Sequence, residues 1–190
     1  MEKIILASAS PRRHQLLQWA EIDFEVIVQE TDESYPSDIA VEQVPEYIAK
    51  NKALAVQQMN HFDRLILAAD TIVVIDDKII GKPKDRADAI QILQTLSARS
   101  HRVITGVVFL KGDEHTSFSD TTIVNFHPLT LDQIEYYVDQ YKPYDKAGAY
   151  AIQEWIGVVG IASIQGDFYN VMGLPVSRVV KKLSVDGWQL

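Results

Sequence analysis

Short apolar stretches alternate with stretches of helical period along the chain. The apolar stretches predict buried strands over residues 3–7, 24–28, 102–110 and 121–126, and over 64–83 with a turn at Asp76 and Asp77. Apolar residues at helical spacing predict helices over residues 11–20, 45–59, 85–97, 130–140 and 174–183. Residues 142–153 show little periodicity. No internal repeat and no linker occurs, so the sequence predicts a single domain over residues 1–190.

Two of the predicted helices carry further information. The helix that begins near Pro45 places four residues on one face by i, i+3 and i, i+4 spacing: Ile48, Lys52, Ala55 and Met59. A lysine on such a stripe commonly extends its ammonium to solvent while its stem is covered. Thr130 and Gln133 stand at capping-box spacing and predict a helix start there.

The composition excludes several classes of function. With 47% hydrophobic and 23% charged residues and no low-complexity tract, the chain is typical of a globular protein. A net charge of −8 argues against a nucleic-acid or anionic-membrane surface, because these partners require clustered positive charge. The absence of cysteine excludes disulfides and thiolate catalysis, and the five histidines lack metal-ligand spacing. No segment predicts a signal peptide or a membrane span, so we expect a cytoplasmic protein.

The stretch "LASASPRR" places two arginines where a helix is predicted to begin. Ser10 is of a type preferred at the N-cap, and a proline follows it, so Arg12 and Arg13 fall in the first helical turn. Cations there oppose the helix dipole at a cost of about 0.3 to 1 kcal/mol each, which a bound anion would offset. The hydroxyls of Ser8 and Ser10 and the two guanidinium groups therefore predict a phosphate cradle. The alternative is a solvated arginine pair on a surface helix.

Asp70 lies inside the apolar strand that begins at residue 64. A lone carboxylate among apolar residues stays ionised only beside a cation, a metal or several hydrogen-bond donors. The neighbouring Thr71 could add a hydroxyl, and Glu33, in an acidic loop, offers a second carboxylate. The alternatives are a structural aspartate bonded to a nearby turn and a solvated loop glutamate.

Two lysines could complete such a site, Lys52 on its apolar stripe and Lys82 in "GKPK". This motif is not a Walker loop, because the upstream glycine and the following serine or threonine are missing, and no G-x-S-x-G or G-x-G-x-x-G motif occurs. Two carboxylates, four cations and a serine-rich helix start suit a metal-assisted attack on a polyphosphate. We therefore expect Mg²⁺ or Mn²⁺ to be held by Glu33 and Asp70.

The motifs together resemble those of the Maf family of nucleoside triphosphate pyrophosphatases. They follow the family's order and spacing over nearly the whole chain and comprise "LASASPRR", "DE" at 32–33, "KNKA" at 50–53, "AADTIVV", "GKPKD", "HRVITGV", "DKAGAYAIQ" and "NVMGLP". The resemblance therefore does not depend on any one of them.

The resemblance implies an α/β fold similar to that of inosine triphosphatases, with a long, mixed, twisted sheet flanked by helices and two lobes around a nucleotide-binding cleft. It implies hydrolysis of a nucleoside triphosphate between the α and β phosphorus atoms, with a divalent cation. Asp70 matches the family's catalytic acceptor. The family's phosphate and metal neighbourhood matches Arg12, Arg13, Glu33, Lys52 and Lys82.

The stretch "DKAGAYAIQ" is similar to the family branch that acts on dTTP and UTP. The branch that acts on 7-methyl-GTP carries a Cys-Ala-Gly-Ser-Phe stretch and a glutamate near the position of Gln153. The Gln153 amide offers a donor and an acceptor, which suit the O4 and N3–H edge shared by thymine and uracil. The resemblance assigns base selection to Arg12, Thr71 and Gln153. The alternatives are the 7-methyl-GTP activity and a non-catalytic nucleotide-binding protein linked to septum formation.

The chain departs from the family pattern at a few positions, and partners beyond the nucleotide are not evident. Ala98 stands where "LSGR" is typical, Ala151 replaces a glycine before Ile-Gln, and Glu154 and Trp155 follow where a glycine is common. These departures concern the base pocket rather than the hydrolytic residues. A homodimer is compatible with the sequence, which shows no interface stripe.

Overall fold

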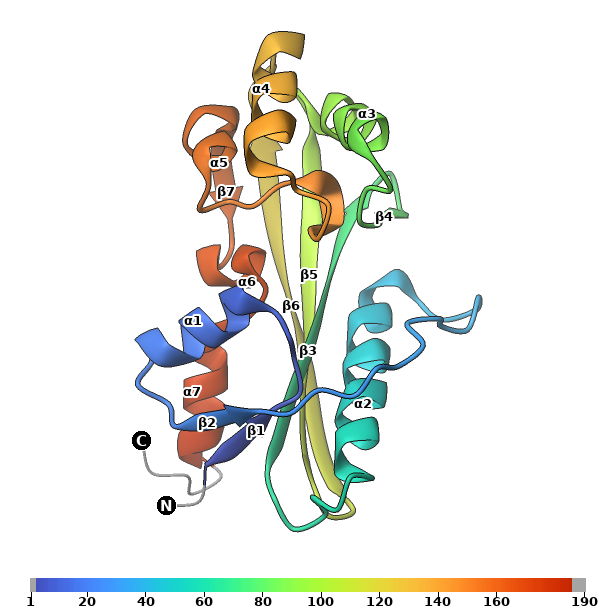
Figure 1. Cartoon of the computed structure of the whole chain (residues 1–190), viewed down its shortest axis with the longest axis vertical. Helices are drawn as coiled ribbons and strands as arrows, with labels where there is room; N and C mark the ends of the chain where they lie inside the picture. The colour runs from blue at the N-terminus through green and yellow to red at the C-terminus, as the bar shows by residue number, and fades with distance from the viewer. Residues whose placement is uncertain (1–2, 186–190) are drawn as a thin grey trace. The chain divides into compact units, whose positions relative to one another are not determined.

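The computed structural model describes residues 3–185, which fold into two compact units. Unit 1 takes in the residues up to Thr71, Thr105–Asp120 and the residues from Gly173 on, and unit 2 takes in Ile72–Ile104 and Thr121–Met172. Within residues 3–185, seven strands form one mixed sheet that helices flank (Figure 1). The predicted α/β fold class is therefore confirmed.

The sheet has the strand order β2-β1-β3-β5-β6-β7, with β4 paired to β3. The strands are β1 (Ile4–Leu6), β2 (Phe24–Val26), β3 (Ile66–Ile75), β4 (Lys78–Ile80), β5 (Ser100–Lys111), β6 (Glu114–Phe126) and β7 (Ile161–Gln165). β1 runs parallel to β2 and to β3, whereas β4 and β7 run antiparallel to β3 and β6. β3, β5 and β6 each contribute residues to both units.

The helices agree with the predicted ones along most of the chain. They are α1 (Pro11–Trp19), α2 (Val44–Gln57), α3 (Arg86–Leu96), α4 (Leu131–Tyr141), α5 (Trp155–Gly160), α6 (Phe168–Met172) and α7 (Val176–Val185), with 3-10 turns η1 (Val41–Gln43) and η2 (Ala147–Ala149). The sequence pattern did not predict α5, β7 and α6, because each is only five or six residues long and too short to show a period. None of the helices within residues 3–185 is long and apolar enough to cross a membrane.

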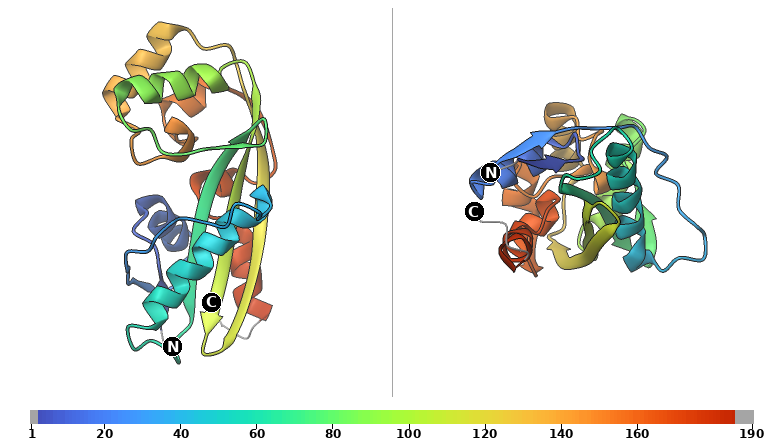
Figure 2. Two further views of the ribbon diagram at one scale, coloured as in Figure 1. Left: turned by 90° about the vertical axis from the view of Figure 1, so that its right-hand side faces the viewer. Right: turned by 90° about the horizontal axis from the view of Figure 1, so that it is seen from below.

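The core of unit 1 lies between α2 and the strands β1, β3 and β5. It is a cluster of buried apolar side chains: Ile5, Ala7, Ala49, Ala53, Val56, Ile66, Ala68, Val108 and Leu110. Figure 2 shows α2 running alongside the long strands. A Cβ at Gly106 of β5 would come 2.2 Å from the backbone nitrogen of Glu46. Only glycine therefore lets the first turn of α2 lie this close to the sheet.

The buried face of α2 differs from the predicted stripe. Its buried residues are Val44, Pro45, Ile48, Ala49, Ala53 and Val56. Of the predicted stripe only Ile48 is fully buried, Lys52 and Ala55 are half-buried, and Met59 is exposed beyond the helix end. The prediction of a face through Ala55 and Met59 is wrong because small alanines, Ala49 and Ala53, turn toward the strands. Lys52 consequently lies at the border of the core.

Unit 2 is fixed by local caps and by buried polar residues. α3 and α4 pack against one another (Figure 1), and the predicted capping box of Thr130 and Gln133 is confirmed. The predicted turn between β3 and β4 is also confirmed, with left-handed φ values of 50° at Asp76 and 57° at Asp77, as a two-residue type I′ hairpin requires. The buried Asn170 donates to the carbonyl of Val103 at 3.1 Å and so joins α6 to β5.

Candidate active site

Asp70 and Thr71 are two adjacent polar residues within the apolar strand β3. Eight of the ten residues of this strand are buried, and these two are half-buried. Because successive side chains point to opposite faces of a strand, Asp70 and Thr71 face different neighbours. Asp70 contacts a residue of α2, and Thr71 contacts a residue of α1. The strand therefore connects two polar groups within unit 1.

Lys52 of α2 joins two carboxylates that are distant in the sequence. Its Nζ lies 2.7 Å from Oδ1 of Asp70 and 2.7 Å from Oε1 of Glu33. The side chains of Lys52 and Asp70 are only 18% and 14% exposed, whereas that of Glu33 is 49% exposed. These three residues, called the Lys52 cluster below, place a cation between two anions at the edge of the core. Opposite charges at this distance attract one another, which holds the three side chains together.

Arg13 is the buried arginine of the pair at the start of α1. It donates from all three nitrogens: Nε to the carbonyl of Gly173 at 2.7 Å, Nη1 to Oγ of Ser8 at 3.0 Å, and Nη2 to Oγ1 of Thr71 at 3.0 Å. A planar guanidinium is suited to such a set of fixed acceptors. The structure thus directs the Arg13 guanidinium to protein acceptors from three segments of unit 1.

The hydroxyl of Thr71 has further neighbours that the sequence analysis did not identify. It lies 2.9 Å from Oγ1 of Thr105, a fully buried residue of β5. Gly173, whose carbonyl accepts from Arg13, has a left-handed φ of 116° that favours glycine. Thr105 had the same sequence signal as Asp70, a polar residue inside an apolar strand, and could have been found by it.

The charges of this region act on one another. Burial lowers the pKa of the Arg13 guanidinium, the nearby charges of Asp70 and Glu33 oppose this fall, and Arg12 adds to it. Arginine stays protonated under all ordinary conditions, so the buried charge persists and must be balanced locally. Unit 1 therefore gathers Arg12, Arg13, Asp70 and Glu33 in one electrostatic environment.

The predicted start of α1 is confirmed in position but not in its cap bond. Ser10 occupies the N-cap and Pro11 follows it, yet the Ser10 side chain accepts no capping hydrogen bond. The Oγ of Ser8 instead accepts from the backbone nitrogen of Ser10 at 3.3 Å and from Arg13. Arg12, in the same turn, is half-buried. The two arginines thus differ in burial although they are neighbours in the sequence.

Lys82 and Gln153 belong to unit 2, and both are exposed. Lys82 follows β4, and Gln153 lies between η2 and α5. Their segments meet, because the backbone nitrogen of Gly148 donates to the carbonyl of Gly81 at 3.1 Å. The motifs "GKPK" and "DKAGAYAIQ" are therefore held together within unit 2.

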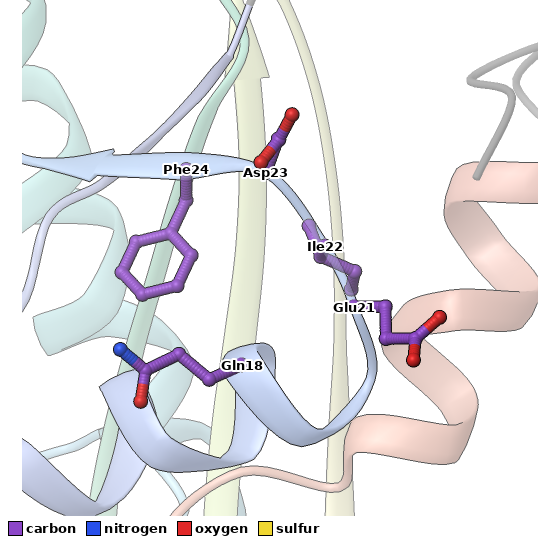
Figure 3. Close-up of a pocket in the computed structure, with 5 residues that line it drawn as sticks. All are labelled: Gln18, Glu21, Ile22, Asp23 and Phe24. Carbon is purple, nitrogen blue, oxygen red and sulfur yellow. The ribbon is translucent and has the colours of Figure 1, made fainter.

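A hollow lined by five residues lies at the other end of α1 from the two arginines. Its lining comprises Gln18, Glu21, Ile22, Asp23 and Phe24, and Figure 3 shows the Phe24 ring and the Gln18 side chain facing one another. It contains none of the predicted site residues and carries two carboxylates, which disfavour an anionic ligand. The Lys52 cluster, and not this hollow, is therefore the candidate active site.

Comparison with known proteins gives the relationship of the chain. The sequence pattern of the family described as "Maf-like protein" matches residues 3–185. The chain belongs to the Maf family. The resemblance noted from its motifs is therefore confirmed over nearly the whole chain.

Curated members of the Maf family are similar to this chain over most of their length. A protein from Parabacteroides distasonis, named "dTTP/UTP pyrophosphatase", is 49% identical over 182 residues, which cover 95% of this chain and 94% of that protein. A protein of the same name from Cytophaga hutchinsonii is 50% identical over 180 residues, which cover 95% of this chain and 82% of that protein. Among solved structures, the Ham1 protein of Staphylococcus aureus aligns with a TM-score of 0.47 and 14% identity, covering 66% of this chain and 72% of that one.

Proposed function

We propose that this Maf protein is a nucleoside triphosphate pyrophosphatase that hydrolyses dTTP and UTP to the nucleoside monophosphate and diphosphate. Relatives at 45–50% identity carry this activity in their names. The observation that carries the proposal is the Lys52 cluster, in which side chains from three distant segments meet at 2.7 Å. Such a site has the charges that hydrolysis of a phosphoanhydride needs.

Asp70 acts as the general base in this proposal. A water held by its carboxylate attacks the α-phosphorus, its proton passes to Asp70, and the bond from that phosphorus to the oxygen of the leaving diphosphate breaks. Lys52 keeps the carboxylate in place and balances its charge. Asp70 is only 14% exposed, so its carboxylate is partly shielded from bulk water. Lys52 is its fixed partner.

The carboxylates of this site also suit the divalent cation that the family implies. One oxygen of Asp70 and one of Glu33 lie 2.7 Å from the same nitrogen, so they converge on a point where a cation is already favoured. Among residues 3–185 no group of three or more His, Cys, Asp or Glu side chains could hold a metal. One or two carboxylates completed by water and substrate phosphates is the usual arrangement for Mg²⁺, and Mn²⁺ accepts similar ligands. When bound, the ion would neutralise phosphate charge and polarise the phosphoryl group.

The remaining residues bind and orient the nucleotide. Arg12, Lys52 and Lys82 balance charge on the triphosphate, and Ser8 and Ser10 offer hydroxyl and backbone groups at the start of α1. Arg13 holds Ser8 and Thr71 in position through its three hydrogen bonds. Arg12, Thr71 and Gln153 select the base, and the amide of Gln153 matches the donor and acceptor edge of thymine and uracil.

A nucleotide panel tests the proposal. The protein is incubated with dTTP, UTP, CTP, GTP and 7-methyl-GTP in the presence of Mg²⁺ or Mn²⁺, and the monophosphate and diphosphate are quantified. We expect both products from dTTP and UTP, with no free phosphate, and loss of activity in a chelator that either cation reverses. Binding of UTP without diphosphate release would contradict the enzymatic function. Preferential cleavage of 7-methyl-GTP would contradict the assigned base.

A further inference from the structure

Gln153 is an exposed side chain on a segment whose other residues are fixed. Ala151 and Ile152 are each 5% exposed, whereas Gln153 is exposed. The backbone turns at Ile152 and Gln153 themselves, because the nitrogen of Glu154 donates to the carbonyl of Ala151 at 3.1 Å. An adaptable surface glutamine does not need such an anchored backbone, but one that reads a ligand edge does.

One hydroxyl holds the residues on both sides of Gln153. Tyr137 of α4 is fully buried, and its hydroxyl accepts from the backbone nitrogen of Ala151 at 3.2 Å. The same hydroxyl donates to Oε2 of Glu154. α4 lies beside the chain that leads into α5 in Figure 1. The segment 151–154 is thus tied to a core side chain before and after its exposed residue.

Glu154 is held from a second direction. Its Oε1 lies 3.6 Å from Nζ of Lys146, a residue only 8% exposed that also pairs with Asp145 at 2.8 Å. Gly157 leaves room for the turn, because a Cβ there would come 1.8 Å from the carbonyl oxygen of Ile152. A buried charge paired in this way is costly to disturb, so the network is rigid.

We propose that Tyr137 and Glu154 are positioning residues that orient Gln153 for base selection. The inference rests on the proposed function and adds the structural device that sets its specificity. Uracil presents an acceptor at position 4 and a donor at N3, whereas cytosine presents the reverse. An amide in one fixed orientation therefore separates UTP from CTP, and an amide free to turn over does not.

The variant Tyr137→Phe tests this role, because it removes the hydroxyl and keeps the ring in the core. We expect KM for UTP and dTTP to rise about five- to tenfold, with kcat changed less than twofold. The ratio of kcat/KM for UTP over CTP should fall by a similar factor. Tyr136→Phe is the matched control. It removes a hydroxyl from the adjacent, half-exposed tyrosine, which packs on Trp155 by its ring, and should leave both quantities unchanged.

Variants of Glu154 separate positioning from general stability. Glu154→Gln still accepts the hydrogen bond of Tyr137 and should keep most of the UTP over CTP preference, whereas Glu154→Ala should lose it as Tyr137→Phe does. The double variant of Tyr137→Phe and Glu154→Ala should lose no more than either single one, since both break one network. If Tyr137→Phe unfolds below the assay temperature, the comparison of Glu154→Gln with Glu154→Ala alone tests the positioning role.

The outcomes distinguish this inference from the proposed function. A wild-type protein that releases no diphosphate from UTP or dTTP overturns both. A wild type that prefers UTP, together with Tyr137→Phe and Glu154→Ala variants that keep that preference, overturns the positioning role alone. A Tyr137→Phe variant that loses kcat equally for UTP and CTP, with KM unchanged, also overturns it.

Discussion

The Lys52 cluster in unit 1 and the pair of His101 and Tyr150 in unit 2 both bury polar side chains, but they do so in opposite ways. Lys52 is charged and lies between two carboxylates, one of which reaches solvent. His101 is 2% exposed, and its Nε2 lies 2.7 Å from the Tyr150 hydroxyl, with the Phe126 ring edge-on to it. Burial lowers the pKa of His101 to about 4 and raises the pKa of Tyr150. The pair is therefore neutral at pH 7.

Under the proposed function, this difference separates charged groups that take part in chemistry from neutral groups that serve packing. A charge at the edge of the core can meet a ligand, and the ligand's own charge then replaces the solvent that burial removed. A neutral pair enclosed by aromatic rings can only hold its neighbours together. Substitutions in the Lys52 cluster should therefore change turnover more than stability, and those at His101 should do the reverse.

The largest effect is expected for Asp70→Asn. The amide keeps the shape of the carboxylate but accepts no proton, so kcat for UTP should fall by about 10²- to 10⁴-fold. The midpoint of urea unfolding should change little, since the amide oxygen still accepts from Lys52. Steady-state kinetics and urea unfolding of the same preparation measure both. Retention of more than a tenth of wild-type kcat would remove Asp70 from the role of base.

Arg13→Lys tests whether the buried arginine stabilises the fold of unit 1. Lysine keeps the charge but cannot reach three acceptors in one plane, so the free energy of unfolding should fall by about 3 kcal/mol. The matched change Arg12→Lys affects a half-buried arginine and should cost less than about 1 kcal/mol. Equal costs at the two positions, measured by urea unfolding, would show that the hydrogen bonds of Arg13 do not contribute to stability.

The sequence predicted much of the sheet because buried strands need long apolar runs, and β3 and β5 have them. It also predicted that Asp70 has a cation, a metal or several hydrogen-bond donors beside it, since a lone carboxylate in such a run does not stay ionised otherwise. Local spacing alone did not decide which group that partner is. Lys52 was a candidate for the site, with an ammonium extended to solvent as the alternative, and only the packing of α2 on the strands brings its Nζ to Asp70. Partners of this kind depend on tertiary contacts that local spacing does not contain.

The arginine pair shows the same limit more sharply. Arg12 and Arg13 are identical neighbours, and the sequence assigned both to a phosphate cradle. The direction of α1 decides that Arg13 points into unit 1, where Ser8, Thr71 and Gly173 accept from it. Tyr137 is a similar case, since its place in a predicted helix says nothing of the partners of its hydroxyl. Hydrogen bonds between distant segments are the part that the sequence leaves open.

Acid should destabilise the protein through His101. The pKa of His101 is near its ordinary value of 6.5 in the unfolded chain and about 4 in the folded one, so between these values the unfolded state binds the extra proton. Stability is therefore lost as the pH falls, by about 1.5 kcal/mol from pH 6.5 to pH 5. Urea unfolding of wild type and His101→Gln at both pH values measures this. Parallel losses in the two proteins would assign the effect to other groups.

The smallest effect is expected at Ala98, which follows α3 and has a left-handed φ of 58°. In the left-handed region the Cβ of alanine is unfavourable by about 1 kcal/mol, and glycine has no Cβ. Ala98→Gly should therefore raise the free energy of unfolding by about 0.5 to 1 kcal/mol. Ala89→Gly, inside α3, should lower it by about 1 kcal/mol or more, because the backbone there is helical and the side chain is buried. Differential scanning calorimetry resolves the opposite signs.

Ala98 contacts the rest of unit 2 through its backbone, because its nitrogen donates to the carbonyl of His127 at 3.1 Å. The kcat for UTP should therefore stay constant in Ala98→Gly while the free energy of unfolding rises. A change in kcat at this position would contradict the separation of chemistry from packing drawn above.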